Sequence, residues 1–81
     1  MKIEIMGTGC PKCTNLAANA EAAAKSLGVP YELCKITQIT DIMKRGVMVT
    51  PAIAINGQVK SAGKVLSEAE ITTLLTSALD Q

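Results

Sequence analysis

Apolar residues recur along this chain at two different spacings, and each spacing predicts a type of secondary structure. Lys2 to Met6 has β-branched residues at alternate positions, which predicts a short strand. The segment from Lys12 to Leu27 is rich in alanine, the best helix former, and predicts a helix. Its apolar positions at helical spacing are Leu16, Ala20, Ala23, Ala24 and Leu27. Pro11 suits the first turn of this helix, while Gly28 and Pro30 end it.

A second strand and a short helix follow in the middle of the chain. Tyr31 to Ile36 predicts the strand. Gln38 to Arg45 predicts the helix, with Thr37 as its N-cap and Gly46 at its end. A strand, a crossover helix and a second strand at the start of a chain imply a parallel pair.

The next apolar segment predicts a β-hairpin. Ala52 to Ile55 and Gln58 to Lys60 predict two strands joined by Asn56-Gly57. Asn-Gly between apolar strands is the strongest short signal for a hairpin, because a type I′ turn needs two residues with positive φ. The hairpin adds two antiparallel strands to the parallel pair.

A capping box closes the pattern. Ser67 and Glu70 have the spacing of a capping box, and they predict a helix that ends near Leu79. The residues expected on its core face are Ile71, Leu74, Leu75 and Leu79. The order β-α-β-α-β-β-α over residues 1–81 then predicts one α/β domain, with a four-stranded mixed sheet and three helices.

Composition and charge exclude several classes of function. The net charge of +1 leaves no basic surplus for nucleic acid or acidic membranes. No apolar run approaches the roughly 18 to 20 residues that span a bilayer, and the N-terminus has no signal-peptide core, so we expect a cytoplasmic protein. The chain contains no histidine, which removes Cys–His nucleophilic catalysis and imidazole bases. Chemistry must therefore come from cysteine, carboxylate and lysine side chains.

The candidate chemistry lies where the first strand meets the first helix, in Cys10-Pro11-Lys12-Cys13. A helix N-terminus stabilises a thiolate, so Cys10, exposed near the N-cap, is predicted to be the nucleophile. Cys13, one turn further, is placed to attack Cys10 when that sulfur is held in a mixed disulfide. Pro11 and Lys12 set the distance between the thiols, and Lys12 adds a positive charge. In a cytoplasmic protein, such a pair favours redox catalysis or metal binding over a structural disulfide.

A soft-metal carrier is the alternative for the same two cysteines. The stretch from Met6 to Cys13 faintly resembles the Met-x-Cys-x-x-Cys loop that binds Cu(I) through two thiolates. That fold runs β-α-β-β-α-β, whereas this chain is predicted to end in a capped helix after a hairpin. A zinc site within one chain lacks ligands, because Cys34 supplies at most a third and histidine is absent. The redox interpretation predicts no metal site.

Three short motifs, in order, span most of the chain. They are Gly7-Thr8-Gly9-Cys10-Pro11-Lys12-Cys13, Thr50-Pro51, and Asn56-Gly57 followed by Ala62-Gly63. On these motifs the chain resembles the thioredoxin superfamily, specifically its compact, glutaredoxin-sized, thioredoxin-like members. The resemblance implies a thioredoxin-like fold and a thiol–disulfide oxidoreductase that reduces protein or small-molecule disulfides. It implies a redox-active Cys10–Cys13 disulfide with no other cofactor. The partners that it implies are disulfide-containing substrate proteins and a reductase as electron donor, for which we expect a flavoprotein. It also implies a monomer.

The resemblance also assigns roles to Thr50 and Pro51. In the family, a proline preceded by Thr or Val at the start of the third strand is cis and faces the disulfide. This implies a cis bond at Pro51, with the Thr50 backbone pairing with substrate. Pro51 needs a special place on other grounds too, because proline cannot donate to a sheet ladder. The alternative is a trans proline that starts an edge strand.

Glu4 has two interpretations. It lies six residues before Cys10, where large thioredoxins carry a buried acid that helps move protons to and from the resolving thiol. On this interpretation the Glu4 carboxylate accepts the proton of Cys13. The alternative is a strand glutamate that reaches solvent.

For three sulfur-containing residues outside the Cys10–Cys13 pair, the sequence predicts simpler roles. Cys34 is expected to be a core residue of the second strand, because free cysteine behaves most often as a small hydrophobe. Met6 and Met48 either contribute to an apolar docking rim or belong to the core.

Overall fold

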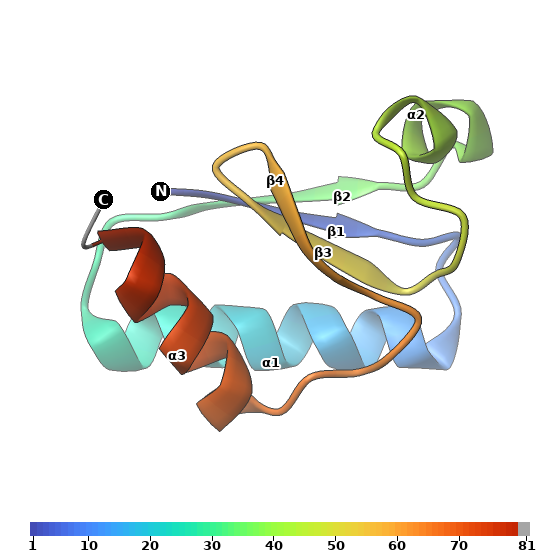
Figure 1. The fold of residues 1–81 in the computed structure, drawn as a ribbon. Coiled ribbons are helices and arrows are strands. Elements are labelled where there is room, and N and C mark those ends of the chain that lie inside the picture. The colour runs from blue at the N-terminus through green and yellow to red at the C-terminus, as the bar shows by residue number, and fades with distance from the viewer. Residues whose placement is uncertain (80–81) are drawn as a thin grey trace.

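A computed structural model describes residues 1–79 of the chain (Figure 1). Its elements are β1 (Lys2–Met6), α1 (Pro11–Leu27), β2 (Glu32–Ile36), α2 (Ile39–Lys44), β3 (Ala52–Ile55), β4 (Gln58–Ala62) and α3 (Glu68–Leu79). The order β-α-β-α-β-β-α is the predicted one, so the α/β fold expected from the sequence is confirmed.

The four strands form one mixed sheet in the order β2-β1-β3-β4. β1 pairs with β2 in parallel and with β3 antiparallel, and β3 and β4 form the predicted hairpin. Asn56 and Gly57 both have positive φ, 52° and 86°, as the turn requires. β1 is therefore a central strand, and its position explains why Ile3 to Met6 are all buried.

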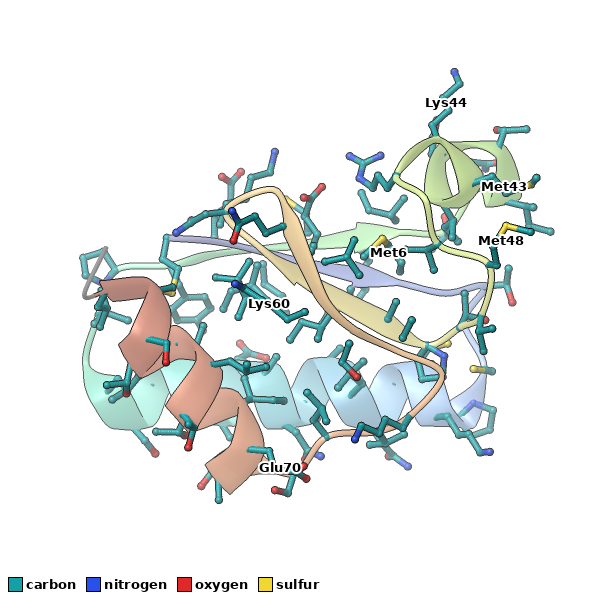
Figure 2. The ribbon with its side chains drawn as sticks, in the orientation of Figure 1. Met6, Met43, Lys44, Met48, Lys60 and Glu70 are labelled. Atoms are coloured by element: carbon teal, nitrogen blue, oxygen red, sulfur yellow. The ribbon has the colours of Figure 1, made fainter. Side chains whose placement is uncertain are left out.

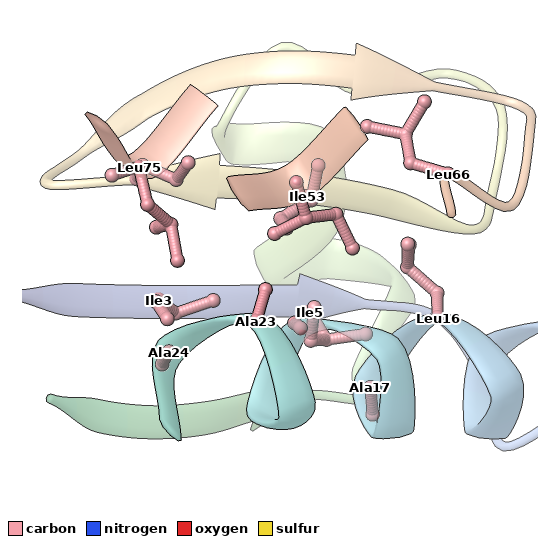
Figure 3. Packing of buried hydrophobic residues seen from close by; sticks show 12 residues of the cluster. Ile3, Ile5, Leu16, Ala17, Ala23, Ala24, Ile53, Leu66 and Leu75 are labelled. Atoms are coloured by element: carbon pink, nitrogen blue, oxygen red, sulfur yellow. The ribbon is translucent and has the colours of Figure 1, made fainter. Parts of the chain in front are cut away.

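Two helices cover one face of the sheet, and the third lies on the other. α1 and α3 pack together on the face that holds the larger core (Figures 1 and 3). Ile3 and Ile5 of β1 belong to this core, which also contains Leu16, Ala17, Ala20, Ala23, Ala24, Ile53, Ile55, Leu66, Ile71 and Leu75. A smaller cluster on the opposite face contains Met6, Ile42, Val47, Ala52 and Ala54. Alternate residues of β1 thus serve two different packing environments.

Both predicted ends of α1 and the predicted start of α3 are confirmed. α1 has Pro11 at its first position, and Gly28 follows it in the left-handed conformation with φ 69°. At α3, the backbone N–H of Glu70 donates to Ser67 Oγ, and that of Ser67 donates to Glu70 Oε1, both at 3.1 Å. These reciprocal bonds are the expected capping box.

α2 differs from the prediction at its start. It spans Ile39–Lys44, and its N-cap is Gln38, so the prediction that Thr37 is the N-cap is wrong. The first intrahelical bond runs from the Ile42 N–H to the Gln38 carbonyl at 3.0 Å, which fixes the cap one residue later. Within the described chain, the Gln38 side chain makes no capping hydrogen bond.

Several boundaries and burial predictions also change. β2 starts at Glu32 instead of Tyr31, and β4 extends to Ala62 instead of Lys60. Leu79 is 50% exposed, so its predicted place on the core face is wrong, whereas Ile71 and Leu75 are fully buried and Leu74 packs partly against the core.

The sulfur-containing side chains outside the Cys10–Cys13 pair also differ in their burial. Cys34 is half-buried and belongs to neither buried cluster, because β2 is an edge strand; the core prediction is therefore wrong. Met6 is completely buried, whereas Met48 is 82% exposed. Of the two, Met48 alone is available to a docking surface.

Candidate active site: the Cys10–Cys13 pair

The sequence places Cys10 at the N-cap of α1, with an extended backbone conformation (φ −68°, ψ 162°). Its carbonyl accepts hydrogen bonds from the Thr14 N–H at 3.0 Å and from Thr14 Oγ1 at 3.3 Å. Its Sγ accepts a hydrogen bond from the Cys13 N–H at 3.3 Å. The sulfur of Cys10 therefore takes the position that a serine or aspartate oxygen takes at an ordinary N-cap.

The two thiols differ in exposure and in acidity. Cys10 is partly exposed, whereas Cys13 is 5% exposed. The hydrogen bond from the Cys13 thiol, followed by backbone N–H bonds from Cys13 and Lys12, lowers the pKa of Cys10 below its ordinary value. Burial, together with the hydrogen bond to Cys10, raises the pKa of Cys13. The arrangement makes Cys10 the thiol that ionises first.

Gly7 is a residue of the site that the sequence analysis did not recognise. A Cβ built on Gly7 would overlap Cys13 Sγ and would also approach Thr50, whose Cβ lies 4.0 Å from that point. The Gly7 N–H donates to the Ile36 carbonyl at 3.0 Å and ties the loop to the end of β2. Gly7 is thus required for close approach, and the signal in the sequence was a glycine in the strand–helix connection.

The Thr50–Pro51 loop is on the same side as the cysteine loop. The Thr50–Pro51 peptide bond is cis, as expected, and the Pro51 ring is buried while Thr50 is exposed. The Pro51 carbonyl accepts a hydrogen bond from the Gly63 N–H at 2.8 Å, which links the loop to the end of β4. Tertiary structure therefore brings Thr50 close to Gly7 and Cys13, whereas Pro11 and Lys12 are exposed on the first turn of α1.

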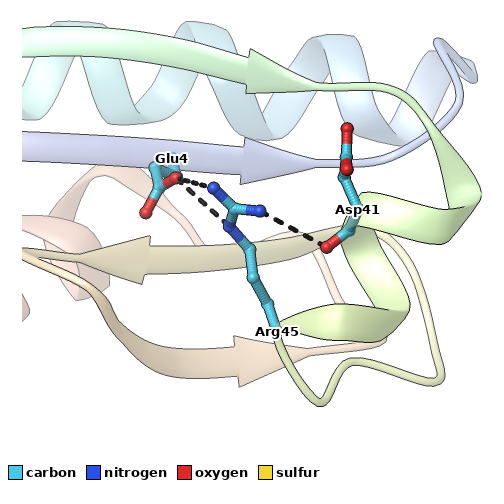
Figure 4. Close-up of polar contacts among 3 residues, drawn as sticks. All are labelled: Glu4, Asp41 and Arg45. Carbon is cyan, nitrogen blue, oxygen red and sulfur yellow. Dashed lines mark hydrogen bonds and ion pairs between the residues drawn. The ribbon is translucent and has the colours of Figure 1, made fainter.

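Glu4 belongs to the face of the sheet opposite the one that α1 covers. It is 5% exposed, so the alternative of a glutamate that reaches solvent is wrong. Its carboxylate Oε2 accepts bonds from Arg45 Nη2 at 2.9 Å and Nε at 3.3 Å (Figure 4). Strand alternation puts Glu4 on the face opposite Ile3 and Ile5, whose face is covered by α1. The structure thus brings Glu4 together with Arg45, a residue that the sequence analysis did not pair with it.

An apolar groove of about 330 Å³ opens between α2 and the loop that follows it. Its lining residues are Thr8, Ile39, Ile42, Met43, Val47, Met48 and Thr50. Ile39, Met43 and Met48 are more than half exposed, and Figure 2 shows Met43 and Met48 on the same side of the molecule. Thr8 and Thr50 also belong to the two loops beside the thiols, so the groove continues from the cysteine pair.

Two further findings concern other classes of protein. Among residues 1–79, no three His, Cys, Asp or Glu side chains cluster in a way that could hold a metal ion. The described helices include none with the length and apolar character needed to cross a membrane. The observed order of elements differs from that of the soft-metal carrier considered as the alternative.

A dithiol at the junction of β1 and α1, beside a cis-proline loop on a four-stranded mixed sheet, defines the thioredoxin-like class of thiol–disulfide oxidoreductases. The thioredoxin domain family model matches residues 1–76. A thioredoxin of Methanothermobacter thermautotrophicus is 41% identical over 76 residues, covering 94% of this chain and 99% of that protein. A thioredoxin of Methanocaldococcus jannaschii is 38% identical over 78 residues, covering 96% of this chain and 90% of that protein. The chain belongs to the thioredoxin domain family and is a thiol–disulfide oxidoreductase.

Proposed function

We propose that this protein reduces disulfides of substrate proteins or small molecules, with Cys10 as the nucleophile and Cys13 as the resolving thiol. The observation that carries the proposal is that the partly exposed Cys10 sulfur accepts the Cys13 N–H at the N-cap of α1, while the Cys13 side chain is buried. In keeping with this geometry, hydrogen bonds from Cys13 lower the pKa of Cys10, and burial raises the pKa of Cys13. An accessible thiolate beside a protonated second thiol is the starting state that reduction of a disulfide requires.

The reaction takes place in two exchanges. The Cys10 thiolate attacks one sulfur of the substrate disulfide, forming a mixed disulfide and releasing the other sulfur as a thiolate that takes a proton. Cys13 loses its proton and attacks Cys10 Sγ, which forms the Cys10–Cys13 disulfide and releases the second substrate thiol. The substrate gains two electrons and two protons, and a reductase returns them to the pair.

The neighbouring residues have supporting roles in this proposal. Thr50 is exposed beside the thiols, where its backbone can pair with an extended substrate segment, and the buried Pro51 fixes the course of that loop. Pro11 starts α1, and the Lys12 N–H contributes to the lowered pKa of Cys10. The pair needs no cofactor besides its own disulfide. The electron donor is a flavoprotein reductase, and the protein works as a cytoplasmic monomer.

Cysteine variants test the assignment of roles. In a Cys34→Ser background, Cys13→Ser should accumulate a mixed disulfide between Cys10 and a substrate such as insulin, because no thiol is left to resolve it. Cys10→Ser should neither reduce insulin nor form the adduct. Mass spectrometry of the non-reduced protein detects the adduct, and turnover by Cys10→Ser would overturn the assignment.

A metal competition experiment separates this function from that of a soft-metal carrier. The reduced wild-type protein is titrated with Cu(I) against a competing chelator, and the same preparation is assayed for insulin reduction. We expect disulfide reduction by the wild type. Tight copper binding without any disulfide reduction would contradict the proposal.

A further inference from the structure

An ion pair between the buried Glu4 and the partly exposed Arg45 joins two elements that are far apart in the sequence. Among residues 1–79, Glu4 is the one charged side chain that is buried. Arg45 approaches its Oε2 with both Nη2 and Nε, and its Nη1 donates to the Asp41 carbonyl at 3.3 Å (Figure 4). The guanidinium therefore links the central strand β1 to the backbone of α2 through three hydrogen bonds.

α2 has few other anchors to the sheet. In the described chain, this six-residue helix buries a single side chain, Ile42. The next buried apolar residue is Val47, which follows the helix in the loop that leads to Thr50. A helix this short contributes little stability of its own, so tertiary contacts decide where it lies. The bonds of Arg45 to Glu4 are thus a large share of what holds α2 in place.

The groove beside the thiols depends on the position of α2. Ile39 and Met43 of α2 form one side of it, and Met48 and Thr50 of the following loop form the other. The two methionines offer flexible, polarisable side chains, which adapt to apolar side chains of different shapes. A displacement of α2 would change the shape of the groove and leave the junction of β1 and α1, which holds Cys10 and Cys13, as it is.

We propose that the Glu4–Arg45 ion pair positions α2 so that its groove receives a large apolar side chain next to the disulfide of a substrate protein. The inference rests on the proposed function, since it concerns how substrates reach Cys10. Continuity favours this occupant, because Thr8 and Thr50 belong both to the groove and to the loops beside the thiols. Glu4 is then a positioning residue that acts through Arg45.

The double variant Glu4→Gln/Arg45→Met tests the proposal. Removal of Arg45 alone would leave the buried charge of Glu4 without compensation, whereas neutralising both residues avoids that penalty. Lys44→Met, a neighbouring exposed lysine of α2, is the matched control. Each variant is assayed with insulin and with the small neutral substrate bis(hydroxyethyl) disulfide, using dithiothreitol as the electron donor.

We expect the double variant to raise KM for insulin at least about threefold without a loss of kcat, the signature of lost binding. Its rate with bis(hydroxyethyl) disulfide should match the wild type, because that substrate is too small to use the groove. Lys44→Met should behave as the wild type with both substrates. Arg45→Lys, which keeps one charged bond, should give an intermediate KM for insulin, and it is the test if the double variant does not fold.

Two results would overturn the inference. An unchanged KM for insulin in both the double variant and Arg45→Lys would show that the ion pair does not control the shape of the groove. An equal fall in rate with both substrates would show that Glu4 acts on the thiols themselves. Failure of the wild type to reduce either disulfide would instead refute the proposed function, so the two failures are distinguishable.

Discussion

The two thiols differ in exposure and acidity because of the local geometry of three residues, Cys10, Cys13 and Gly7. Cys10 is the N-cap of α1, so its sulfur accepts the Cys13 N–H and lies at the positive end of the helix. Cys13 is one turn inside the helix, where its sulfur is buried against Gly7. Hydrogen bonds from Cys13 lower the pKa of Cys10, whereas burial, together with the hydrogen bond to Cys10, raises the pKa of Cys13. The contact between the two residues and the burial of Cys13 thus make the thiols differ in acidity.

Removing the Cys13 thiol should raise the pKa of Cys10. The Cys13 side chain is the largest cause of the lowered pKa, so Cys13→Ala loses that stabilisation of the thiolate and Cys13→Ser keeps a donor. In a Cys34→Ser background, the rate of iodoacetamide alkylation at Cys10 is followed against pH. Its midpoint should lie higher in Cys13→Ala than in Cys13→Ser. Equal midpoints in the two variants would contradict this account of the acidity of Cys10.

Gly7→Ala should slow the second exchange. An added Cβ would overlap Cys13 Sγ, so the sulfur must move from the position in which it contacts Cys10. Quenched-flow mass spectrometry should then show a longer-lived mixed disulfide at Cys10. Asn15→Ala, at an exposed position on α1, serves as the control. A mixed disulfide resolved as fast as in the wild type would show that Cys13 has room to adjust.

At the scale of elements, the three helices are fixed in different ways. α1 has local signals at both ends, with Pro11 at its first position and Gly28 after its last. α3 starts with the capping box of Ser67 and Glu70. α2 ends, like α1, before a left-handed glycine, Gly46 with φ 80°, but its N-cap makes no side-chain hydrogen bond in the described structure. This six-residue helix is held to the sheet by Ile42 and Arg45, so its position depends more on tertiary contacts than that of α1 or α3.

The capping box of α3 should contribute measurable stability with a defined pH dependence. Ser67→Ala should lower the free energy of unfolding by about 1 kcal/mol, whereas Ser77→Ala, at an exposed interior position of α3, should not lower it. The Ser67 N–H lowers the pKa of Glu70. Because the pKa of Glu70 is lower in the folded than in the unfolded state, the stabilising contribution of its charge is present above the unfolded-state pKa. It is lost as pH falls through the folded-state pKa.

Glu70→Gln tests the charged part of that contribution. Glutamine keeps the acceptor but not the charge, so the variant should be less stable than the wild type at neutral pH. Urea denaturation at several pH values should show the difference vanishing as pH falls below the folded-state pKa of Glu70. A difference that persists in acid would mean that the loss has another cause.

At the scale of the whole molecule, the central sheet separates stability from recognition. The larger core lies between the sheet and the α1–α3 layer and contains most of the buried aliphatic side chains. The opposite face has the smaller cluster, the Glu4–Arg45 ion pair and the exposed methionines of the groove. Changes in the larger core, away from the start of α1 with Cys10 and Cys13, should therefore affect unfolding more than the redox reaction.

Leu75 and Leu79 provide a matched comparison on one helix. Leu75 is fully buried, so Leu75→Ala should lower the free energy of unfolding by about 2 to 5 kcal/mol. Leu79 is 50% exposed, and Leu79→Ala should cost less than about 0.5 kcal/mol. Denaturant titration measures both, and the alkylation rate of Cys10 in folded protein should stay the same. Equal losses for the two variants would contradict the observed packing of α3.

The order of elements, both ends of α1, the start of α3, the hairpin turn and the position of the Cys10–Cys13 pair were predictable from the sequence alone. Each depends on residues that are adjacent or a turn apart, such as Ser67 with Glu70 or Asn56 with Gly57. The Cys10–Cys13 pair is of the same kind, because the start of a helix fixes the geometry of residues three apart. Such signals need no knowledge of what covers the element.

Only the tertiary structure decided the roles of Glu4, Arg45, Gly7 and Leu79. The alternation of Lys2 and Glu4 with Ile3 and Ile5 puts Glu4 on the other face of β1, but it does not show that this face is covered and that Glu4 is buried. The partner of Glu4 comes from a short helix 41 positions away, and the close approach of Gly7 to Cys13 depends on how the loop packs on α1. Leu79 has helical spacing from Leu75 but is 50% exposed, whereas Leu75 is fully buried. These features depend on which surfaces of the elements pack together. Hydrophobic periodicity shows which face of an element is apolar, but it does not show which other element covers that face.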